Sequence, residues 1–378
     1  MKKKLAIIGA SYLQLPLIER AKSLGIETHV FAWSCNDVGE KVADFFYPIS
    51  IIEKEQILER CREIGIDGIT SIASDTAMLT VNYVAEQLSL IGNTSVCTLS
   101  TTNKHAMRLC FQEHGDPSPF SMEVIDPNDI DIDSFSYPVI VKPEDRSGSR
   151  GVTKVYRKED LLAAISNAKE LSFNGNALIE EYVDGDEYSV ETISWKGKHH
   201  ILAYTKKYTT GSPSFIETAH LEPAFSADDP RLSGIQDMIL HALDSLDIRY
   251  GASHSEFKIT SKGELYIIEI GSRMGGDCIG SSLVQLSTGI DFVKAVIEIA
   301  LGIEPDLTSY ISESSAIRYV FEQRDIDDLE KIRNDKDITI VQEENIKLPT
   351  NKVTDSSSRS GFYVLHAKDK KSLLRYFT

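Results

Sequence analysis

The chain has 378 residues, more than the roughly 100–200 of one typical domain, so we expect two or three compact units. Its 42% hydrophobic and 26% charged residues are typical of a folded globular protein and exclude a disordered chain. The net charge of −17 disfavours nucleic acid and acidic membranes as partners. The five cysteines form no CxxC pair, and the first apolar run ends at Gly9, so we expect a cytoplasmic protein without a signal peptide.

The first hundred residues alternate apolar strands with helix-period segments. We expect strands at residues 5–9, 27–31 and 68–72, and a helix through residues 17–24. Strands separated by helices predict right-handed crossovers and a parallel sheet. Residues 1–97 are therefore expected to form a Rossmann-like α/β domain.

The turn after the first strand, residues 9–14, keeps only the first glycine of the GxGxxG dinucleotide pattern. No acidic residue follows the second strand, where Ala32-Trp33-Ser34 stands instead. The pattern therefore disfavours a nicotinamide site. We expect a structural domain that helps to frame a substrate cleft.

A Ser/Thr-rich segment, residues 98–104, begins the next unit and offers helix caps. Farther on, Lys142 ends a β-branched run, and a buried lysine needs an anionic partner. The loop that follows contains Gly148 and Gly151 and can turn backbone N–H groups toward phosphate oxygens. A flexible hairpin with a surface lysine is the alternative interpretation.

Residues 177–190 indicate an apolar strand that runs into Glu180 and Glu181, a turn at residues 184–186, and a second strand. The two acids are typical of a solvated strand end. They also suit a nucleotide site, because an exposed strand can bind adenine through its main chain and a carboxylate can bind its amino group or the ribose. The residues themselves leave both interpretations open.

Two strand-like segments, residues 251–260 and 264–270, flank a short turn. If Lys262-Gly263 is a two-residue turn, Glu256 lies directly opposite Glu269. Facing carboxylates repel each other, and a divalent cation such as Mg²⁺ turns that repulsion into a binding site. A three-residue turn would shift the register and break this pairing. Arg273, four residues beyond Glu269, is suited to stabilise charge on a transferred group.

Residues 311–378 contain strand-like segments at 316–321 and 361–365 around a charged helix near 325–333. We expect a small α+β cap. Its SSSRS segment, residues 356–360, is interpreted as a polar turn in preference to a second substrate-facing loop.

Taken in this order, the stretches resemble the ATP-grasp superfamily from about residue 100 to residue 302. The resemblance implies two α+β subdomains, residues 98–190 and 191–310, that hold ATP between them. It implies Mg²⁺ or Mn²⁺ bound by Glu256 and Glu269, and it gives catalytic roles to Lys142 and Arg273. The implied ATP contacts are Lys104, Lys142, Ser147, Gly148, Ser149, Gly151, Glu180, Glu181, Tyr182, Val183 and Glu187.

Many members of this superfamily carry Glu-x-Asn-x-Arg at the last strand, with the asparagine as a further metal ligand. Gly271 stands in that place here, so one magnesium is held less well or by water. Glu-Ile-Gly-x-Arg followed by Gly-Gly, with the 215–220 segment upstream, is similar to the branch of L-amino-acid ligases and carnosine-synthase-like enzymes. This similarity implies the substrate contacts Glu217, His220, His254, Arg273, Gly275, Gly276 and Asp277.

Glu217 and His220 can also be ordinary loop residues. From charge alone, an acid at Asp277 favours a cationic or amino-bearing substrate group. The resemblance implies an ATP-dependent carboxylate–amine ligase that works through an acyl phosphate, with a small-molecule carboxylate and amine as its partners. The alternatives are another ATP-grasp ligase or carboxylase, or an ATP-binding sensor without turnover. A homodimer is expected by base rate.

Overall fold

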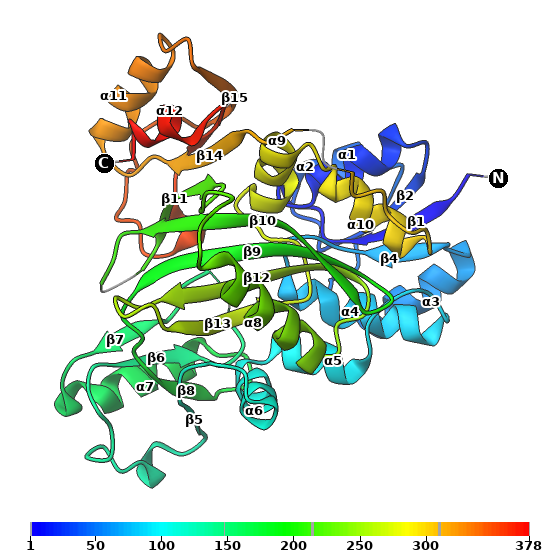
Figure 1. Ribbon diagram of the computed structural model, residues 1–378. Coiled ribbons are helices and arrows are strands. Elements are labelled where there is room, and N and C mark those ends of the chain that lie inside the picture. Colours follow the sequence, from blue (N-terminus) through cyan, green and yellow to red (C-terminus); the bar gives the residue numbers. More distant parts are fainter. Residues whose placement is uncertain (1, 147, 213–214, 309–310, 378) are drawn as a thin grey trace.

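The computed structural model describes residues 2–146, 148–212, 215–308 and 311–377 (Figure 1). Its N-terminal part is a four-stranded parallel sheet in the order β3–β2–β1–β4, which confirms the predicted parallel α/β domain. The strands are β1 Lys4–Ile8, β2 Glu27–Phe31, β3 Phe45–Tyr47 and β4 Gly68–Thr70. The helices are α1 Leu15–Ser23, α2 Val38–Val42, α3 Lys54–Ile64 and α4 Asp75–Gln87.

Two helices, α5 (Ser95–Thr102) and α6 (Lys104–His114), lead into a second sheet. This sheet is antiparallel in the order β5–β8–β6–β7, and we call it the lid sheet. Helix α7 (Leu161–Leu171) packs on it through the buried residues Leu161, Ile165 and Ala168. The strands are β5 Ser121–Val124, β6 Val139–Pro143, β7 Thr153–Val155 and β8 Ala177–Glu181, with short 3₁₀ turns at Pro127–Asp129 and Lys158–Asp160.

The largest sheet, which we call the central sheet, has eight antiparallel strands in the order β13–β12–β9–β10–β11–β14–β16–β15. Its last three strands come from the C-terminal region, so the expected cap extends the central sheet through the pairing of β11 with β14. The strands are β9 Asp186–Trp195, β10 Lys198–Thr209, β11 Glu217–Glu222, β12 Gly251–Ile259, β13 Leu265–Gly271, β14 Ser314–Tyr319, β15 Ile338–Glu344 and β16 Phe362–Ala367. The helices are α8 Leu232–Ser245, α9 Val284–Thr288, α10 Phe292–Ala300, α11 Gln323–Ile332 and α12 Lys370–Leu374, with a π-helical turn at Ile279–Leu283 and a 3₁₀ turn at Ser356–Ser358.

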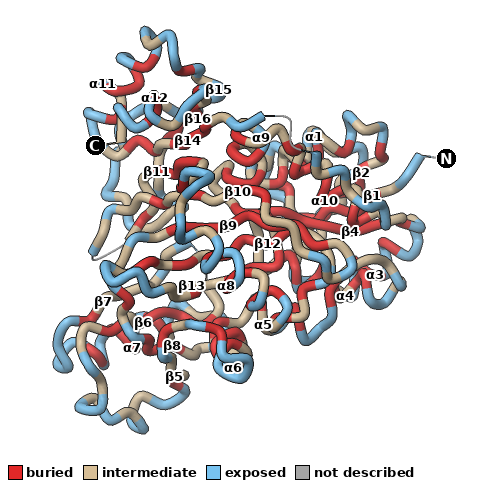
Figure 2. Tube along the Cα trace, in the orientation of Figure 1, coloured by how far each residue is buried: buried red, intermediate tan, exposed pale blue. Residues whose placement is uncertain are grey.

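One hydrophobic core joins the N-terminal sheet to the central sheet. Leu17 and Ile18 of α1 belong to the same buried cluster as Val293 and Val296 of α10. The same cluster contains Leu5 of β1, Ile193 of β9 and Ala252 of β12, and Figure 2 shows buried residues in red along these strands. The loops that follow the N-terminal strands are thereby held against the central sheet. In the described ranges, no helix has both the length and the apolar character required to cross a bilayer.

Candidate active site

A cleft of about 180 Å³ lies between the lid sheet and the edge of the central sheet. The structure brings many of the predicted ATP, metal and substrate residues together on its walls. These residues are Lys104, Lys142, Gly148, Ser149, Glu180, Glu181, Tyr182, Val183, Glu187, Glu217, His254, Glu256, Glu269 and Arg273. Other predicted residues are not on these walls, namely Gly151, His220, Gly275, Gly276 and Asp277, and Ser147 lies outside the described residues.

Lys142 has the anionic partner that its buried position requires. Its Nζ lies 2.6 Å from Oε2 of Glu180, and Nε of Arg108 lies 3.0 Å from Oε1 of the same carboxylate. Burial by itself raises the pKa of Glu180, but Arg108 and Lys142 outweigh it and lower this pKa to about 2. Glu180 is therefore a buried anion that holds two cations, and the interpretation as a solvated strand end fits only the exposed Glu181.

The loop after β6 needs its glycines. Gly148 and Gly151 have φ values of +69° and +73°, which side chains rarely adopt. At Gly151 a Cβ would also lie 2.9 Å from Leu171 and Pro143. The loop is fixed at its centre, where the Ser149 hydroxyl donates to the carbonyl of Phe215 at 3.3 Å. The described part of the loop therefore lies against the cleft, which Gly148 and Ser149 line.

Glu256 and Glu269 pair directly across β12 and β13, although the predicted turn was wrong. Thr260 pairs with Glu264 through an N–H to O bond of 3.0 Å, so the turn has three residues, 261–263, and the register starts one residue off. An irregularity between Glu256 and Phe257 then shifts the register back. The pairing that we expected is thus produced by two features that compensate each other.

The carboxylates of Glu256 and Glu269 both line the cleft, and both have cationic partners. Lys104 contacts Oε1 of Glu269 at 2.9 Å, and Lys207 and His254 contact Oε1 of Glu256 at 2.6 and 3.2 Å. Burial opposes the charge of Glu256, but Lys207 and His254 hold its pKa well below the usual range. Glu256 is therefore held as an anion in the cleft, and carboxylate oxygens are ligands of the kind that Mg²⁺ prefers. Gly271 adds no side-chain ligand, as the sequence indicated.

Lys207 was not predicted. Its ammonium is buried and lies 3.1 Å from Glu187, 3.8 Å from Glu217 and 2.6 Å from Glu256. Burial favours the neutral form, but these carboxylates raise the pKa of Lys207 well above its usual value. In the sequence, Lys206 and Lys207 appear together as an ordinary charged pair. Only the strand alternation separates them, because Lys206 points away and binds Asp186.

His254 is held by an acid that the sequence analysis also missed. Its Nδ1 bonds to Glu191, whose other oxygen accepts the N–H of Gly275 at 3.0 Å. Burial works against protonation, but Glu191 and Glu256 raise the pKa of His254 to about 9. The imidazole is therefore a cation near neutral pH. A Cβ at residue 275 would lie 2.7 Å from Glu191, so this position requires glycine.

Arg273 is fixed by the N-terminal domain. Its Nε donates to Oδ1 of Asp75 at 2.7 Å and its Nη2 to Oδ2 at 3.0 Å. Asp75 is the first residue of α4, about 200 positions earlier in the chain. Because such long-range pairs leave no local pattern, the sequence offered no signal for this contact.

The expectation for Asp277 needs correction. Its carboxylate is already neutralised by Arg359, whose Nη1 and Nη2 donate at 2.9 and 2.6 Å, and Nε2 of His220 lies 3.3 Å away. Arg359 is itself buried and stacks on Tyr319 with its Cζ 3.6 Å from the ring centroid. Asp277 therefore offers no free charge to a cationic substrate group.

The SSSRS segment of the cap is a turn, as expected, and it also contacts predicted site residues. The Ser356 hydroxyl donates to Oε2 of Glu217 at 2.6 Å, and Arg359 donates to the Glu217 carbonyl at 3.2 Å. The amide of Ser356 donates to the carbonyl of Gly148, in the loop after β6, at 3.5 Å. Arg359 and Ser356 thus connect the cap, the loop and the substrate end of the cleft.

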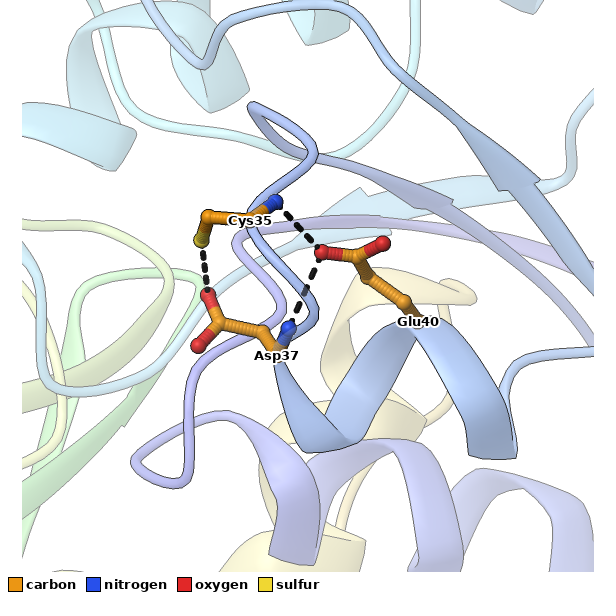
Figure 3. A group of neighbouring side chains, drawn as sticks. All are labelled: Cys35, Asp37 and Glu40. Carbon is orange, nitrogen blue, oxygen red and sulfur yellow. Dashed lines mark hydrogen bonds between the residues drawn. The ribbon is translucent and has the colours of Figure 1, made fainter.

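Cys35, Asp37 and Glu40 form a separate group of possible metal ligands at the start of α2 (Figure 3). Oε1 of Glu40 accepts the N–H groups of Cys35 and Asp37 at 2.8 and 3.0 Å, and the Cys35 thiol donates to Asp37. These bonds form a capping box, which fully explains the arrangement as the start of a helix.

Residues 135–281 match the family model of the ATP-grasp domain. The chain is 26% identical over 265 residues to the L-arginine-specific L-amino acid ligase of Bacillus subtilis. The matched region is 68% of this chain and 63% of that protein. It is 24% identical over 313 residues to the alanine–anticapsin ligase of Bacillus subtilis, covering 73% of this chain and 66% of the relative. The chain thus spans just under two thirds of these two ligases.

A third relative, the carbamoyl phosphate synthase large chain of Thermoanaerobacter pseudethanolicus, is 21% identical over 270 residues, which are 70% of this chain and 24% of that protein. Among solved structures, the L-amino acid ligase from Bacillus licheniformis superposes with a TM-score of 0.82 at 23% identity over 100% of this chain and 96% of the other. Phosphoribosylglycinamide synthetase from Anaerococcus prevotii gives 0.78 at 19% identity, covering 100% and 97%. These likenesses establish the fold.

Proposed function

We propose that this chain, which carries an ATP-grasp domain within an ATP-grasp fold, is an ATP-dependent carboxylate–amine ligase. In this proposal it joins amino-acid substrates through an acyl phosphate and releases ADP and phosphate. The main support is the facing pair of Glu256 and Glu269, which shares one cleft with Lys104, Lys142 and Arg273. The names of two relatives, an L-amino acid ligase and an alanine–anticapsin ligase, support amino acids as the substrate class.

The cleft supplies positive charge where phosphates would lie. Lys104 of α6 and Lys142 of β6 line the cleft together with Gly148 and Ser149 of the loop after β6, and in this proposal backbone N–H groups of that loop bind the phosphates. Such groups stabilise charge that develops on a transferred phosphoryl group without having to rearrange. Glu256 and Glu269 are the residues that would hold a magnesium ion, which would neutralise further charge on the phosphate oxygens.

The proposed reaction has two steps, the formation of the acyl phosphate and its reaction with the amine. A substrate carboxylate oxygen attacks the γ-phosphorus of ATP, the bond to the β-phosphate oxygen breaks, and ADP leaves. A neutral amine then attacks the acyl carbon, the bond to the phosphate oxygen breaks, and the amine proton leaves with phosphate or water. Arg273 is suited to stabilise the oxyanion of the second step, because its guanidinium lines the cleft and keeps its positive charge.

His254 has an orienting role in this scheme. As an imidazolium that bonds to Glu191 through Nδ1 and Glu256 through Nε2, it has no free nitrogen to accept a proton. Glu217 lies at the substrate end, between Lys207 and Ser356, and can hold the amino group of a substrate. Contacts of the Gly148 loop with the cap close this end and limit hydrolysis of the acyl phosphate.

We also infer a cytoplasmic protein, because all five cysteines are free thiols, and a homodimer, because symmetric dimers are the commonest assemblies. The test of the function is phosphate release from ATP and Mg²⁺ with amino acids offered singly and in pairs. Release that requires two amino acids, with a dipeptide mass in the product, supports the proposal. Tight ATP binding without release across the panel contradicts it in favour of another carboxylate or a sensor.

A further inference from the structure

We propose that Asp75, in the N-terminal domain, is a positioning residue that sets the guanidinium of Arg273, and that residue 271 is glycine because the Asp75 carboxylate fills the space of its side chain. The inference rests on the proposed function, in which Arg273 stabilises charge at the reacting group. It assigns a part in the chemistry to a domain that does not contribute to the nucleotide cleft walls.

The ion pair has the geometry of a fixed clamp. Nε and Nη2 of Arg273 bind the two oxygens of Asp75 side by side at 2.7 and 3.0 Å. The side chains are 13% and 17% exposed, so solvent screens the pair little. A two-point contact of this kind fixes the plane of the guanidinium as well as its position.

Asp75 is itself held firmly. It is the first residue of α4, where the helix dipole favours an anion, and the preceding Ser74 caps the helix by accepting the N–H of Ala77. Without Asp75, the guanidinium would be drawn toward Glu269 and Glu256, the other anions that act on it. The two-point contact with Asp75 therefore opposes the attraction of these two carboxylates on the Arg273 guanidinium.

Gly271 shows how closely the pair fills its surroundings. A Cβ at residue 271 would lie 2.8 Å from Oδ1 of Asp75 and 3.3 Å from Nε of Arg273. Any side chain at residue 271 must therefore displace the clamp. Asp75 and Gly271 are distant in sequence, but the Asp75 carboxylate fills the space that a side chain at residue 271 would need. We therefore expect substitutions at the two positions to affect turnover through the same contact.

The backbone at Arg273 does not depend on Asp75. The N–H of Ala73 donates to the carbonyl of Met274 at 3.2 Å, and the hydroxyls of Thr101 and Ser272 are 3.0 Å apart. The shared core adds further contacts between the two domains. A substitution of Asp75 is therefore expected to release the guanidinium and leave the fold intact.

The first test compares Asp75→Asn, Asp75→Glu and unchanged protein in kcat and in ATP affinity. We expect Asp75→Asn to lower kcat about 100-fold, with the ATP dissociation constant changed by less than about threefold, and Asp75→Glu to recover part of the loss. The matched control is Asp291→Asn, which removes another ion pair between the two domains, with Arg20, and is expected to keep kcat. A kcat of Asp75→Asn equal to that of this control would overturn the inference.

The second test is a double-mutant cycle of Asp75→Ala and Gly271→Ala. Because both act through the clamp, the double variant is expected to lose no more kcat than Asp75→Ala does. If the loss of kcat in the double variant equalled the product of the two single losses, the two positions would act independently, which would contradict the inference. A third readout needs no turnover, namely the ¹⁵N-labelled Nε–H signal of Arg273, which we expect to shift in Asp75→Asn. If unchanged protein shows no ligase activity, the proposed function fails, and this signal alone decides: a shift supports the inference and an unchanged signal overturns it.

Discussion

Glu256 and Glu269 face each other across β12 and β13, and each carboxylate binds a different lysine, Lys207 and Lys104. Two anions in register destabilise a hairpin unless cations compensate them. The lysines provide that compensation, and both use Oε1 of their acid. The hairpin is therefore arranged around negative charge that suits a divalent cation.

Glu269→Gln is expected to lower Mg²⁺-dependent phosphate release at least about 100-fold, because an amide is a poor magnesium ligand. The protein should still fold, since β13 keeps its backbone pairing with β12. The control is Glu264→Gln, an exposed acid next to the turn of the same hairpin, which should release phosphate normally. Activity retained in Glu269→Gln would mean that this carboxylate binds no metal.

Lys142→Met is expected to weaken ATP binding at least about tenfold, measured by calorimetry, because the phosphates lose a buried positive partner. Glu180 keeps its contact with Arg108, so the lid sheet should remain folded. Lys158→Met, on the exposed side of the same subdomain, is the control and should bind ATP as before. Equal affinities of the two variants would remove Lys142 from the nucleotide site.

Arg359→Gln is expected to shift substrate preference toward amino acids with cationic side chains. Without the guanidinium, Asp277 is a partly buried carboxylate that keeps His220 beside it but has lost its arginine partner, and a cation from the substrate can replace that partner. The measurement is kcat/KM for lysine or arginine relative to a neutral amino acid of similar size. A ratio that does not change would place Asp277 outside the substrate pocket.

The buried carboxyl of Glu222 is expected to make the folding stability of the protein depend on pH. This carboxyl is fully buried, accepts hydrogen bonds from Thr205 and Ser287, and burial raises its pKa to about 8. A raised carboxyl pKa gives stability that is complete below the unfolded pKa of about 4.3 and is lost as the pH rises through 8. Glu222→Gln should therefore show a smaller fall in melting temperature between pH 6 and pH 9 than unchanged protein.

His254 also titrates near pH 9, but it does so in both proteins, so the difference between them reports on Glu222. Glu264→Gln, which changes an exposed acid, should show the same fall as unchanged protein. Parallel curves for Glu222→Gln and unchanged protein would mean that Glu222 is ionised in the folded state.

The sequence predicted the parts of the site that depend on local pattern. Lys142 at a strand end, the glycine loop after it and the facing acids of one hairpin all have signals within about twenty residues. The hairpin also shows the limit of such signals. A three-residue turn and a compensating irregularity produce the expected pairing, and neither feature follows from strand propensity.

Most of the residues that the sequence analysis missed have partners that are distant in the chain. Asp75 meets Arg273, Glu191 meets His254, and Arg359 neutralises Asp277 only once three parts of the chain have assembled. The charge of Asp277 alone therefore led to the wrong expectation. A carboxylate's effect on a substrate depends on its partners, and these are set by tertiary packing.

The central claim, an acyl phosphate intermediate, is tested most directly with a substrate whose carboxylate carries ¹⁸O. If the carboxylate attacks the γ-phosphate and the amine then expels phosphate, one ¹⁸O atom moves into the released inorganic phosphate in each turnover. We predict that mass spectrometry finds this label in phosphate in a one-to-one ratio with amide product. Phosphate free of ¹⁸O, formed alongside the amide, would contradict the account.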